Sequence, residues 1–251
     1  MNYNRMIKDL KDIKKEEVNL FGGKATNLGF LMQNGFNVPD GFCISTQIKK
    51  LDKGTKKEII KRYKKLKSLI SVRSSATSED SKDTSFAGQF DTFLNIKSQI
   101  ELLKSIEKCW KSVKSERVVA YLKNKNLNNI KMAVIIQKMI NADFAGVIFT
   151  LDPISEKNVL IEFVKGLGNK LVSGRITPTS YLVDRNSFDI TNKSDNTRMK
   201  ESLIKNLTKT TLQIEELYNF PQDIEFAIQG NTIYILQSRP ITTLHKIKEL
   251  N

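Results

Sequence analysis

The sequence predicts an α+β fold, and two observations support this prediction. Residues up to about Asn128 alternate helical hydrophobic patterns with polar loops. From Lys131 onward, short β-like apolar runs replace them. The chain has 251 residues, of which 39% are hydrophobic and 27% charged, so it is long enough and apolar enough to bury a sizeable core.

Two helices are predicted in the first half. Lys24–Asn34 carries Leu28, Leu31 and Met32 at helical spacing, and Gly35 follows as a C-terminal stop. The second helix is predicted at Ile100–Lys123. Its apolar stripe is imperfect and consists of Leu103, Ile106, Trp110, Val113 and Val118.

Three short strands are predicted after residue 130. Met132–Ile140 and Phe144–Leu151 are apolar runs separated by three polar or small residues, which suggests that the two strands pair. Asn158–Val164 is a further strand candidate that ends before a glycine-containing loop.

The last predicted element is a hairpin of Asp223–Ile228 and Thr232–Arg239. A two-residue turn at Gly230-Asn231 would place Glu225 and Gln237 on opposite faces, whereas a three-residue loop would place them on the same face. Burial favours the three-residue loop because it gathers five apolar side chains on one face. These are Ile224, Phe226, Ile228, Tyr234 and Leu236.

The other face of this hairpin would then carry Asp223, Glu225, Gln237 and Arg239. Carboxylate, amide and guanidinium groups that converge on one sheet face are typical of a metal–phosphate site.

Three other segments are polar in ways that a structural role does not require. Gly22-Gly23-Lys24 precedes a helix, where an anion is favoured, although a Gly-Gly pair before a helix is more often just a turn. Ser71–Asp91 places Arg73 among many hydroxyl groups, which suits either an anion cradle or a Ser-rich loop. Gln137 interrupts an apolar strand, so it binds either backbone or a ligand such as a purine edge.

The net charge of +14 invites a nucleic-acid interpretation. The densest basic stretch, Lys49–Lys67, has few aromatic residues to stack on bases and is better explained as a solvated helix face. Nucleic acid is therefore not an expected partner.

Other classes of function are excluded by what the chain lacks. Its single histidine, His245, rules out histidine-based triads as the core chemistry, and Cys43 and Cys109 have no metal-type spacing. No apolar run approaches the roughly 18 residues of a membrane helix, and the N-terminus has no secretory pattern. We therefore expect a cytoplasmic protein without a membrane partner.

Together these segments resemble the N-terminal ATP-binding domain of the pyruvate phosphate dikinase and phosphoenolpyruvate synthase family, which includes rifampin phosphotransferase. Five stretches in family order carry the resemblance and cover most of the chain. They are GGKATNLGFLMQNGFNVPDGFCIST, SVRSSATSEDSKDTSFAGQFDTFLNI, VIIQKMINADFAGVIFTLDP, IEFVKGLGNKLVSGRITPTSYLV and PQDIEFAIQGNTIYILQSRPIT.

The resemblance implies an ATP-grasp-like fold in which two α+β lobes clamp ATP. Residues 1–251 would form this one ATP-binding domain, with an N-terminal lobe of about 1–130 and a C-terminal lobe of about 131–251. The C-terminal lobe would contain a mostly antiparallel sheet.

The resemblance also assigns roles to residues of the first lobe. Lys24 and Arg73 would hold the ATP phosphates, and Gly88 and Thr92 would touch the phosphate tail. Gln137 would lie at the adenine end, with the backbone of Lys138–Ile140 as a hinge.

In the second lobe, Glu225 and Gln237 would ligate Mg²⁺, and Arg239 would stabilise the transferring phosphoryl group. The catalytic residues implied are Lys24, Arg73 and Arg239, and the cofactors are ATP and Mg²⁺.

The sequence departs from the family pattern in three places. The segment between Ser45 and Ser71 is shorter, and Asn169 stands where members often carry Glu. Full-length dikinases also pass phosphate through a histidine on a separate swivelling domain, which these residues do not contain.

The implied function is phosphoryl transfer from Mg-ATP to an acceptor that the chain does not itself carry. The acceptor would be a phosphohistidine-carrying domain or chain, or a small molecule. A stand-alone small-molecule kinase and a non-catalytic nucleotide-binding module are the alternatives.

Overall fold

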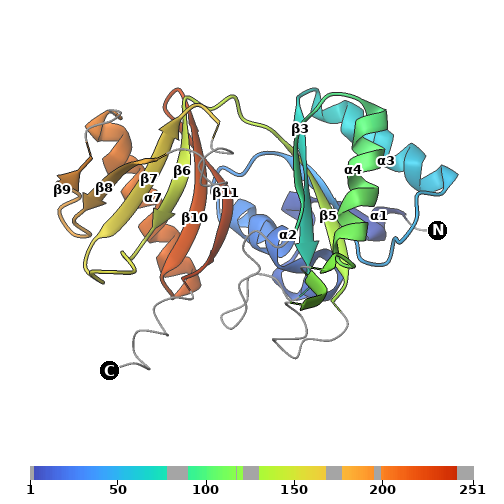
Figure 1. Cartoon of the computed structure of the whole chain (residues 1–251), viewed down its shortest axis with the longest axis horizontal. Helices are drawn as coiled ribbons and strands as arrows, with labels where there is room; N and C mark the ends of the chain where they lie inside the picture. The colour runs from blue at the N-terminus through green and yellow to red at the C-terminus, as the bar shows by residue number, and fades with distance from the viewer. Residues whose placement is uncertain are drawn as a thin grey trace. The chain divides into compact units, whose positions relative to one another are not determined.

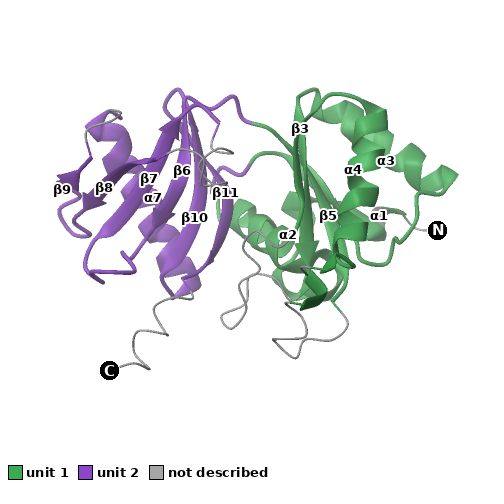
Figure 2. Ribbon diagram, in the orientation of Figure 1, with its two compact units in different colours: residues 1–35, 39–139 green, residues 36–38, 140–251 purple. Residues whose placement is uncertain are grey.

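The computed structural model describes residues 3–77, 90–116, 118–120, 130–167, 177–194 and 199–241. The chain divides into two compact units (Figure 2). Unit 1 comprises residues 1–35 and 39–139, and unit 2 comprises residues 36–38 and 140–251. The sequence placed the boundary at about residue 130, whereas strand β5 (Met132–Lys138) belongs to unit 1 because it pairs there with two other strands.

Unit 1 is built on a five-stranded sheet in the order β1-β2-β5-β3-β4, and every neighbouring pair is antiparallel. The remaining strands are β1 (Ile7–Asp9), β2 (Gly41–Ile44), β3 (Ile70–Ala76) and β4 (Thr92–Ile96). The helices are α1 (Tyr3–Met6), α2 (Val18–Gln33), α3 (Lys53–Leu66) and α4 (Gln99–Ser112), with short 3₁₀ helices at Leu10–Asp12 and Lys15–Glu17.

The two faces of this sheet are covered by different helices (Figure 1). One face forms a buried cluster in which Val72 and Ile136 of the sheet pack with Ile59 of α3 and Ile106 of α4. On the opposite face, α2 contacts β2, β3 and β5. Unit 1 is therefore a sheet between two helical layers.

Helix α2 confirms the first predicted helix but begins earlier, at Val18, and breaks at Gly22. Gly22 has a φ of 76° and a ψ of 167°, which lie outside the helical range. The break separates a short first turn from the predicted stretch, and Gly35, with a φ of 84°, follows the helix end.

Helix α4 is shorter than predicted, since it ends at Ser112. Ile106 is buried as expected, but Leu103 and Trp110 are only partly buried. The stripe that packs inward instead consists of Leu102, Ser105, Ile106, Cys109 and Ser112. Cys109 and the small serines were not recognised as buried positions, because their side chains are weak hydrophobic signals.

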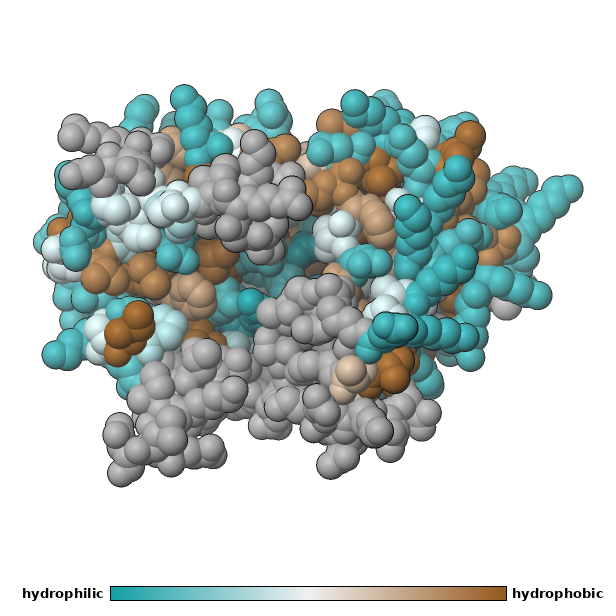
Figure 3. All heavy atoms as spheres, in the orientation of Figure 1, coloured by the Kyte–Doolittle hydropathy of each residue, from teal (hydrophilic) through white to brown (hydrophobic). Residues whose placement is uncertain are grey.

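Helix α3 confirms the solvated interpretation of the basic stretch. Asp52 caps it by accepting a hydrogen bond from the Thr55 N–H at 2.7 Å, and Ile59 is buried. Its exposed positions are all lysines, namely Lys53, Lys56, Lys57, Lys61, Lys64 and Lys65. Hydrophilic side chains accordingly dominate the right-hand side of Figure 3, where α3 lies.

Unit 2 is built on a six-stranded antiparallel sheet in the order β11-β10-β6-β7-β8-β9, against which helix α7 (Glu201–Tyr218) packs. Its strands are β6 (Phe144–Phe149), β7 (Val159–Lys165), β8 (Thr179–Val183), β9 (Ile190–Lys193), β10 (Gln222–Gln229) and β11 (Thr232–Pro240). The α+β class and the antiparallel sheet of the C-terminal half are thus confirmed.

The predicted pairing of the strands now labelled β5 and β6 is wrong. β5 pairs with β2 and β3 in unit 1, whereas β6 pairs with β7 and β10 in unit 2. The residues between the two strands connect unit 1 to unit 2 and do not form a hairpin turn. A connection this short is equally compatible with a hairpin, so its length did not distinguish the two.

The β10–β11 hairpin is confirmed, but its predicted loop is wrong. Gln229 pairs with Thr232, so the turn has two residues, Gly230-Asn231. A β-bulge then shifts the register between Glu225 and Phe226, because Phe226 pairs with Ile235 whereas Glu225 pairs with Gln237. The extra residue in β11 is Leu236.

The bulge changes which side chains enter the core. Ile233 and Ile235 are buried, whereas Tyr234 and Leu236, which the sequence placed on the apolar face, are only partly buried. We call the side that carries Ile224, Phe226 and Ile235 the apolar face of the sheet, and the other side the site face.

Candidate functional site

The polar residues predicted in unit 1 lie on the face of the sheet that α2 covers. Arg73 in β3 stands directly opposite Thr92 in β4, and Ser71 stands opposite Gln137 in β5. Opposed residues of antiparallel strands share a face, and so do alternate residues of one strand. Arg73, Thr92 and Gln137 therefore share one face, opposite the cluster packed under α3 and α4.

Ser75, two residues after Arg73, joins this face to the start of α2. Its hydroxyl donates to the Phe21 carbonyl at 2.8 Å and accepts from the Ala25 N–H at 3.1 Å. A Cβ on Gly22 would lie 2.2 Å from the Ser75 carbonyl oxygen, so only glycine fits at this close approach. We call this close contact between Gly22 and Ser75 the joint between α2 and β3. It fixes where the helical part of α2 begins.

This joint sets the position of Lys24. Lys24 lies in the first turn after the break at Gly22 and is partly exposed. The N-terminal turn of a helix favours anions, and a lysine there adds a positive charge. Both the turn and the phosphate-binding interpretations of the sequence are therefore compatible with this geometry.

Arg73 and Gln137 are buried, whereas Thr92 is exposed. The Gln137 side-chain amide donates to the Pro39 carbonyl at 3.0 Å, which is the backbone-bound state that the sequence left open as an alternative. Its contact with adenine stays a prediction. Gly88 lies outside the described residues.

The second group of predicted residues lies on the site face of unit 2. Asp223 stands directly opposite Arg239, and Glu225 stands directly opposite Gln237. The Asp223 carboxylate accepts from the Arg239 Nη2 at 2.6 Å and from its Nε at 2.9 Å. The expected grouping of four polar side chains on one face is confirmed, although by a bulge and not by a longer loop.

Burial raises the pKa of the Asp223 carboxyl above its ordinary value. The Arg239 guanidinium acts against this rise, and the neighbouring Glu225 carboxylate adds to it. Asp223 therefore holds Arg239 in place while sitting in an environment that disfavours its own charge. The sequence placed Asp223 on this face but assigned it no role.

The Glu225–Gln237 pair fits the ligand chemistry of Mg²⁺. Both side chains end in hard oxygen donors, and Mg²⁺ in nucleotide sites commonly takes one or two protein oxygens together with phosphates and water. Among the described residues no cluster of three or more His, Cys, Asp or Glu side chains could hold a metal ion. A metal at this pair would therefore share its coordination with a ligand such as a nucleotide.

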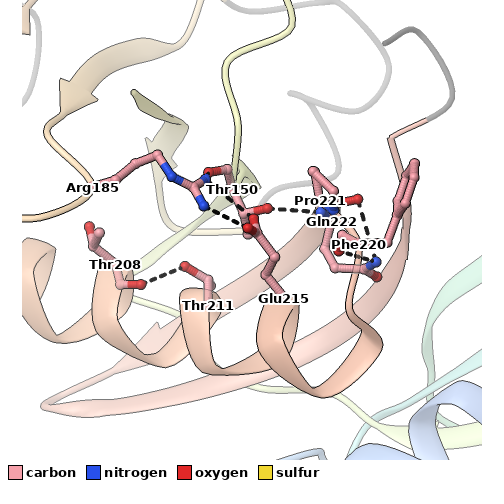
Figure 4. A network of polar contacts seen from close by, with 8 residues as sticks. All are labelled: Thr150, Arg185, Thr208, Thr211, Glu215, Phe220, Pro221 and Gln222. Carbon is pink, nitrogen blue, oxygen red and sulfur yellow. Dashed lines mark hydrogen bonds and ion pairs between the residues drawn. The ribbon is translucent and has the colours of Figure 1, made fainter. Parts of the chain in front are cut away.

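A polar network holds the start of β10, and with it the site face (Figure 4). The Gln222 N–H donates to the Thr150 hydroxyl at 2.8 Å, and the Thr150 N–H donates to the Gln222 carbonyl at 2.9 Å. Arg185 donates to the Thr150 carbonyl and pairs with Glu215 of α7 at 2.6 Å. Nothing in the local sequence signals this network, because its members come from four separate segments.

The sequence matches the family described as "Pyruvate phosphate dikinase, AMP/ATP-binding domain" over residues 47–197 and 189–251. The chain belongs to this family. None of the helices in the described part of the chain could span a membrane.

Relatives within the pyruvate phosphate dikinase group share about a third of their residues with the chain. A probable phosphoenolpyruvate synthase of Archaeoglobus fulgidus is 34% identical and aligns with 96% of this chain but 42% of its own length. An uncharacterized phosphotransferase of Bacillus subtilis is 34% identical, over 94% of this chain and 35% of its own length. A rifampicin phosphotransferase of Bacillus cereus is 32% identical, with coverages of 98% and 37%.

The chain thus spans less than half of the length of these relatives. Among solved structures, a D-alanine–D-alanine ligase from Bacillus anthracis has a TM-score of 0.48 at 10% identity, over 88% of this chain and 57% of the ligase. A dinucleotide-forming acetyl-coenzyme A synthetase from Ca. Korarchaeum cryptofilum has a TM-score of 0.49 at 12% identity, over 86% of this chain and 90% of the other.

Proposed function

We propose that this chain binds ATP with Mg²⁺ and transfers a phosphoryl group from it, as the ATP-handling part of a dikinase-like phosphotransferase. Membership of the ATP-binding family supports nucleotide binding. The observation that carries the proposal is the pairing of Glu225 with Gln237 beside the Asp223–Arg239 ion pair. This face combines oxygen donors for a cation with a guanidinium for a phosphate.

In this proposal the residues of unit 1 bind the nucleotide. Lys24 and Arg73 hold phosphate oxygens, and Gly88 and Thr92 contact the phosphate tail. Gln137 contacts the adenine end, with the Lys138–Ile140 backbone as the hinge. Positioning and charge stabilisation are the main contributions that a protein makes to phosphoryl transfer.

On unit 2, Glu225 and Gln237 would hold Mg²⁺. When bound, the metal would neutralise phosphate charge. Arg239 donates hydrogen bonds to the transferring phosphoryl group, and Asp223 orients the guanidinium through its two hydrogen bonds. Catalysis in this proposal consists of binding and orientation by these side chains.

The acceptor in this proposal is a histidine on a separate domain or chain, or a small molecule. Transfer of the β-phosphoryl group would leave AMP and phosphate, whereas transfer of the γ-phosphoryl group would leave ADP. One relative is named for phosphoenolpyruvate synthesis and another for phosphotransfer to rifampicin, and these names support phosphotransfer without selecting the acceptor.

The test is calorimetric titration with ATP in the presence and absence of Mg²⁺, followed by phosphorus NMR of the same samples. We compare the wild-type chain with Glu225→Gln, which keeps the shape but removes a charged ligand. Glu216→Gln on the exposed surface of α7 is the matched control.

We expect Mg²⁺-dependent binding in the wild type and the control, and binding weakened about 10–100-fold in Glu225→Gln. Absence of ATP binding in the wild-type chain, or equal Mg²⁺ dependence in all three proteins, contradicts the proposed function.

A further inference from the structure

Two polar side chains lie within the otherwise apolar face of the β10–β11 hairpin. Gln222 is 1% exposed and Ser238 is fully buried. The Ser238 hydroxyl donates to the Gln222 Oε1 at 2.8 Å, and the Gln222 amide donates to the Phe220 carbonyl at 2.9 Å. Burying a polar group lowers the stability of the fold unless the group is hydrogen-bonded, so two polar side chains at these positions suggest a specific role.

This pair lies directly behind the site face. Gln222 immediately precedes Asp223, and Ser238 stands between Gln237 and Arg239 in β11. Because successive strand residues point to opposite faces, the bond joins the two strands under the residues that carry the proposed chemistry.

The bulge at Leu236 shifts the pairing of β10 with β11. The turn alone therefore does not determine which residues pair between the bulge and the end of β11. The Gly230-Asn231 turn fixes the pairs between itself and the bulge, such as Phe226 with Ile235. If that register continued without a bulge, Glu225 would stand opposite Leu236. Gln237 would then point to the apolar face.

The Ser238–Gln222 bond is compatible with only one of these two registers. In the bulged register Ser238 stands opposite Ile224, on the apolar face that Gln222 shares. In the register without a bulge it would stand opposite Asp223, on the other side of the sheet. The bond therefore discriminates between the arrangement that pairs Glu225 with Gln237 and the one that separates them.

Gln222 is itself held from two further directions. Its backbone N–H donates to the hydroxyl of Thr150, which directly follows β6, at 2.8 Å, and its carbonyl accepts from the Thr150 N–H at 2.9 Å. Thr150 in turn accepts from Arg185, which pairs with Glu215 of α7 (Figure 4). Ser238 thus fixes β11 to a part of β10 that is anchored to the rest of unit 2.

We propose that Gln222 and Ser238 are positioning residues that lock the register of the hairpin beyond its bulge, so that Glu225 and Gln237 oppose each other as a cation-binding pair. The cation-binding part rests on the proposed function. The register part rests on the hairpin geometry alone, so each part has its own measurement.

The experiment compares Ser238→Ala, Ser238→Thr and the double variant Gln222→Met/Ser238→Ala. The first removes the hydroxyl that donates to the buried Gln222 Oε1, the second keeps the hydroxyl, and the third replaces both groups by apolar ones. Ser112→Ala is the matched control, because this buried hydroxyl donates to the Cys109 carbonyl in unit 1, far from the hairpin in sequence.

Three readouts separate positioning from stability. They are the thermal midpoint, the binding of Mn²⁺ with a non-hydrolysable ATP analogue followed by electron paramagnetic resonance, and cross-strand backbone NOEs. The Ala227–Tyr234 NOE reports the register between the turn and the bulge. The Glu225–Gln237 NOE reports the register on the far side of the bulge from the turn.

We expect Ser238→Ala to lose the Glu225–Gln237 NOE but keep the Ala227–Tyr234 NOE, and to bind Mn²⁺ about 10–100-fold more weakly. Ser238→Thr should restore both. The double variant should recover the thermal midpoint without recovering Mn²⁺ binding, because stability returns but the register lock does not.

Unchanged Glu225–Gln237 NOEs in both alanine-containing variants would overturn the inference, as would Mn²⁺ affinity that simply follows the thermal midpoint. If wild type and Glu225→Gln bind Mn²⁺ equally while the NOEs change as expected, the proposed function fails and the register lock stands.

Discussion

Asp223 is a buried carboxyl group whose pKa is lowered by Arg239 and raised by Glu225. Burial dominates and raises the pKa above the ordinary value of 3.8, despite the ion pair with Arg239. The folded chain therefore retains the Asp223 proton at pH values where the unfolded chain has lost it. The free energy of unfolding contributed by this group falls as pH rises through that window.

This sign can be measured by urea unfolding of the wild type and Asp223→Asn, without nucleotide, between about pH 3 and pH 7. The unfolding free energy of the wild type minus that of the variant should decrease as pH rises above 3.8. A difference that instead grows with pH would mean that Arg239 outweighs burial and lowers the pKa.

The two cysteines are predicted to be inert thiols. Burial raises the pKa of Cys43 well above its ordinary range and that of Cys109 to about 12. Thiolate is the reactive form, so neither group should react with a disulfide reagent at pH 8 in the folded protein. Both should react once denaturant is added, and rapid labelling of the native chain would contradict the buried placement.

At the scale of elements, the joint between α2 and β3 depends on one glycine. Gly22→Ala would force a side chain into a positive φ and place its Cβ 2.2 Å from the Ser75 carbonyl oxygen. We expect a loss of about 2–4 kcal/mol in the free energy of unfolding, from backbone strain and overpacking together.

Gly35→Ala separates these two causes. Gly35 also has a positive φ, of 84°, but a Cβ there would meet nothing within 4 Å. Its cost should be only the backbone part, about 1–2 kcal/mol. Urea unfolding of both variants measures the difference, and equal losses would show that the contact with Ser75 can relax.

The hairpin illustrates how far alternation alone can predict an element. The faces of Asp223, Glu225, Gln237 and Arg239 followed correctly from the need to gather apolar residues on one side. With an unbroken strand pairing, only a three-residue loop gathers these residues on one face, whereas the protein has a two-residue turn and a bulge at Leu236. A bulge leaves no local composition signal, and Tyr234 and Leu236 were consequently placed in the core in error.

The whole molecule was harder to predict because its sheets are assembled from distant segments. The order β1-β2-β5-β3-β4 brings Arg73 beside residues far along the chain, and no local pattern specifies such pairing. The sequence analysis interpreted Ser71–Asp91 as either an anion cradle or a Ser-rich loop and predicted no strand there, although strand β3 occupies Ile70–Ala76. Helix α7 was not foreseen at all.

Two compact units, each built on its own sheet, should also unfold separately. Trp110 is the only tryptophan in the chain and lies in unit 1, so its fluorescence reports that unit alone. We expect its urea midpoint to differ from the midpoint measured by far-ultraviolet circular dichroism, which averages both units. Coincident midpoints would indicate a single cooperative transition.

The three residues 36–38 belong to unit 2 although both flanking segments belong to unit 1. Within unit 2, the Ile235 N–H of edge strand β11 donates to the Asn37 carbonyl at 2.8 Å. A ribosome makes Asn37 long before Ile235, so this contact closes only after β11 has been synthesised. A product that stops before β11 would release unit 1 with this segment still lacking the strand to which it binds.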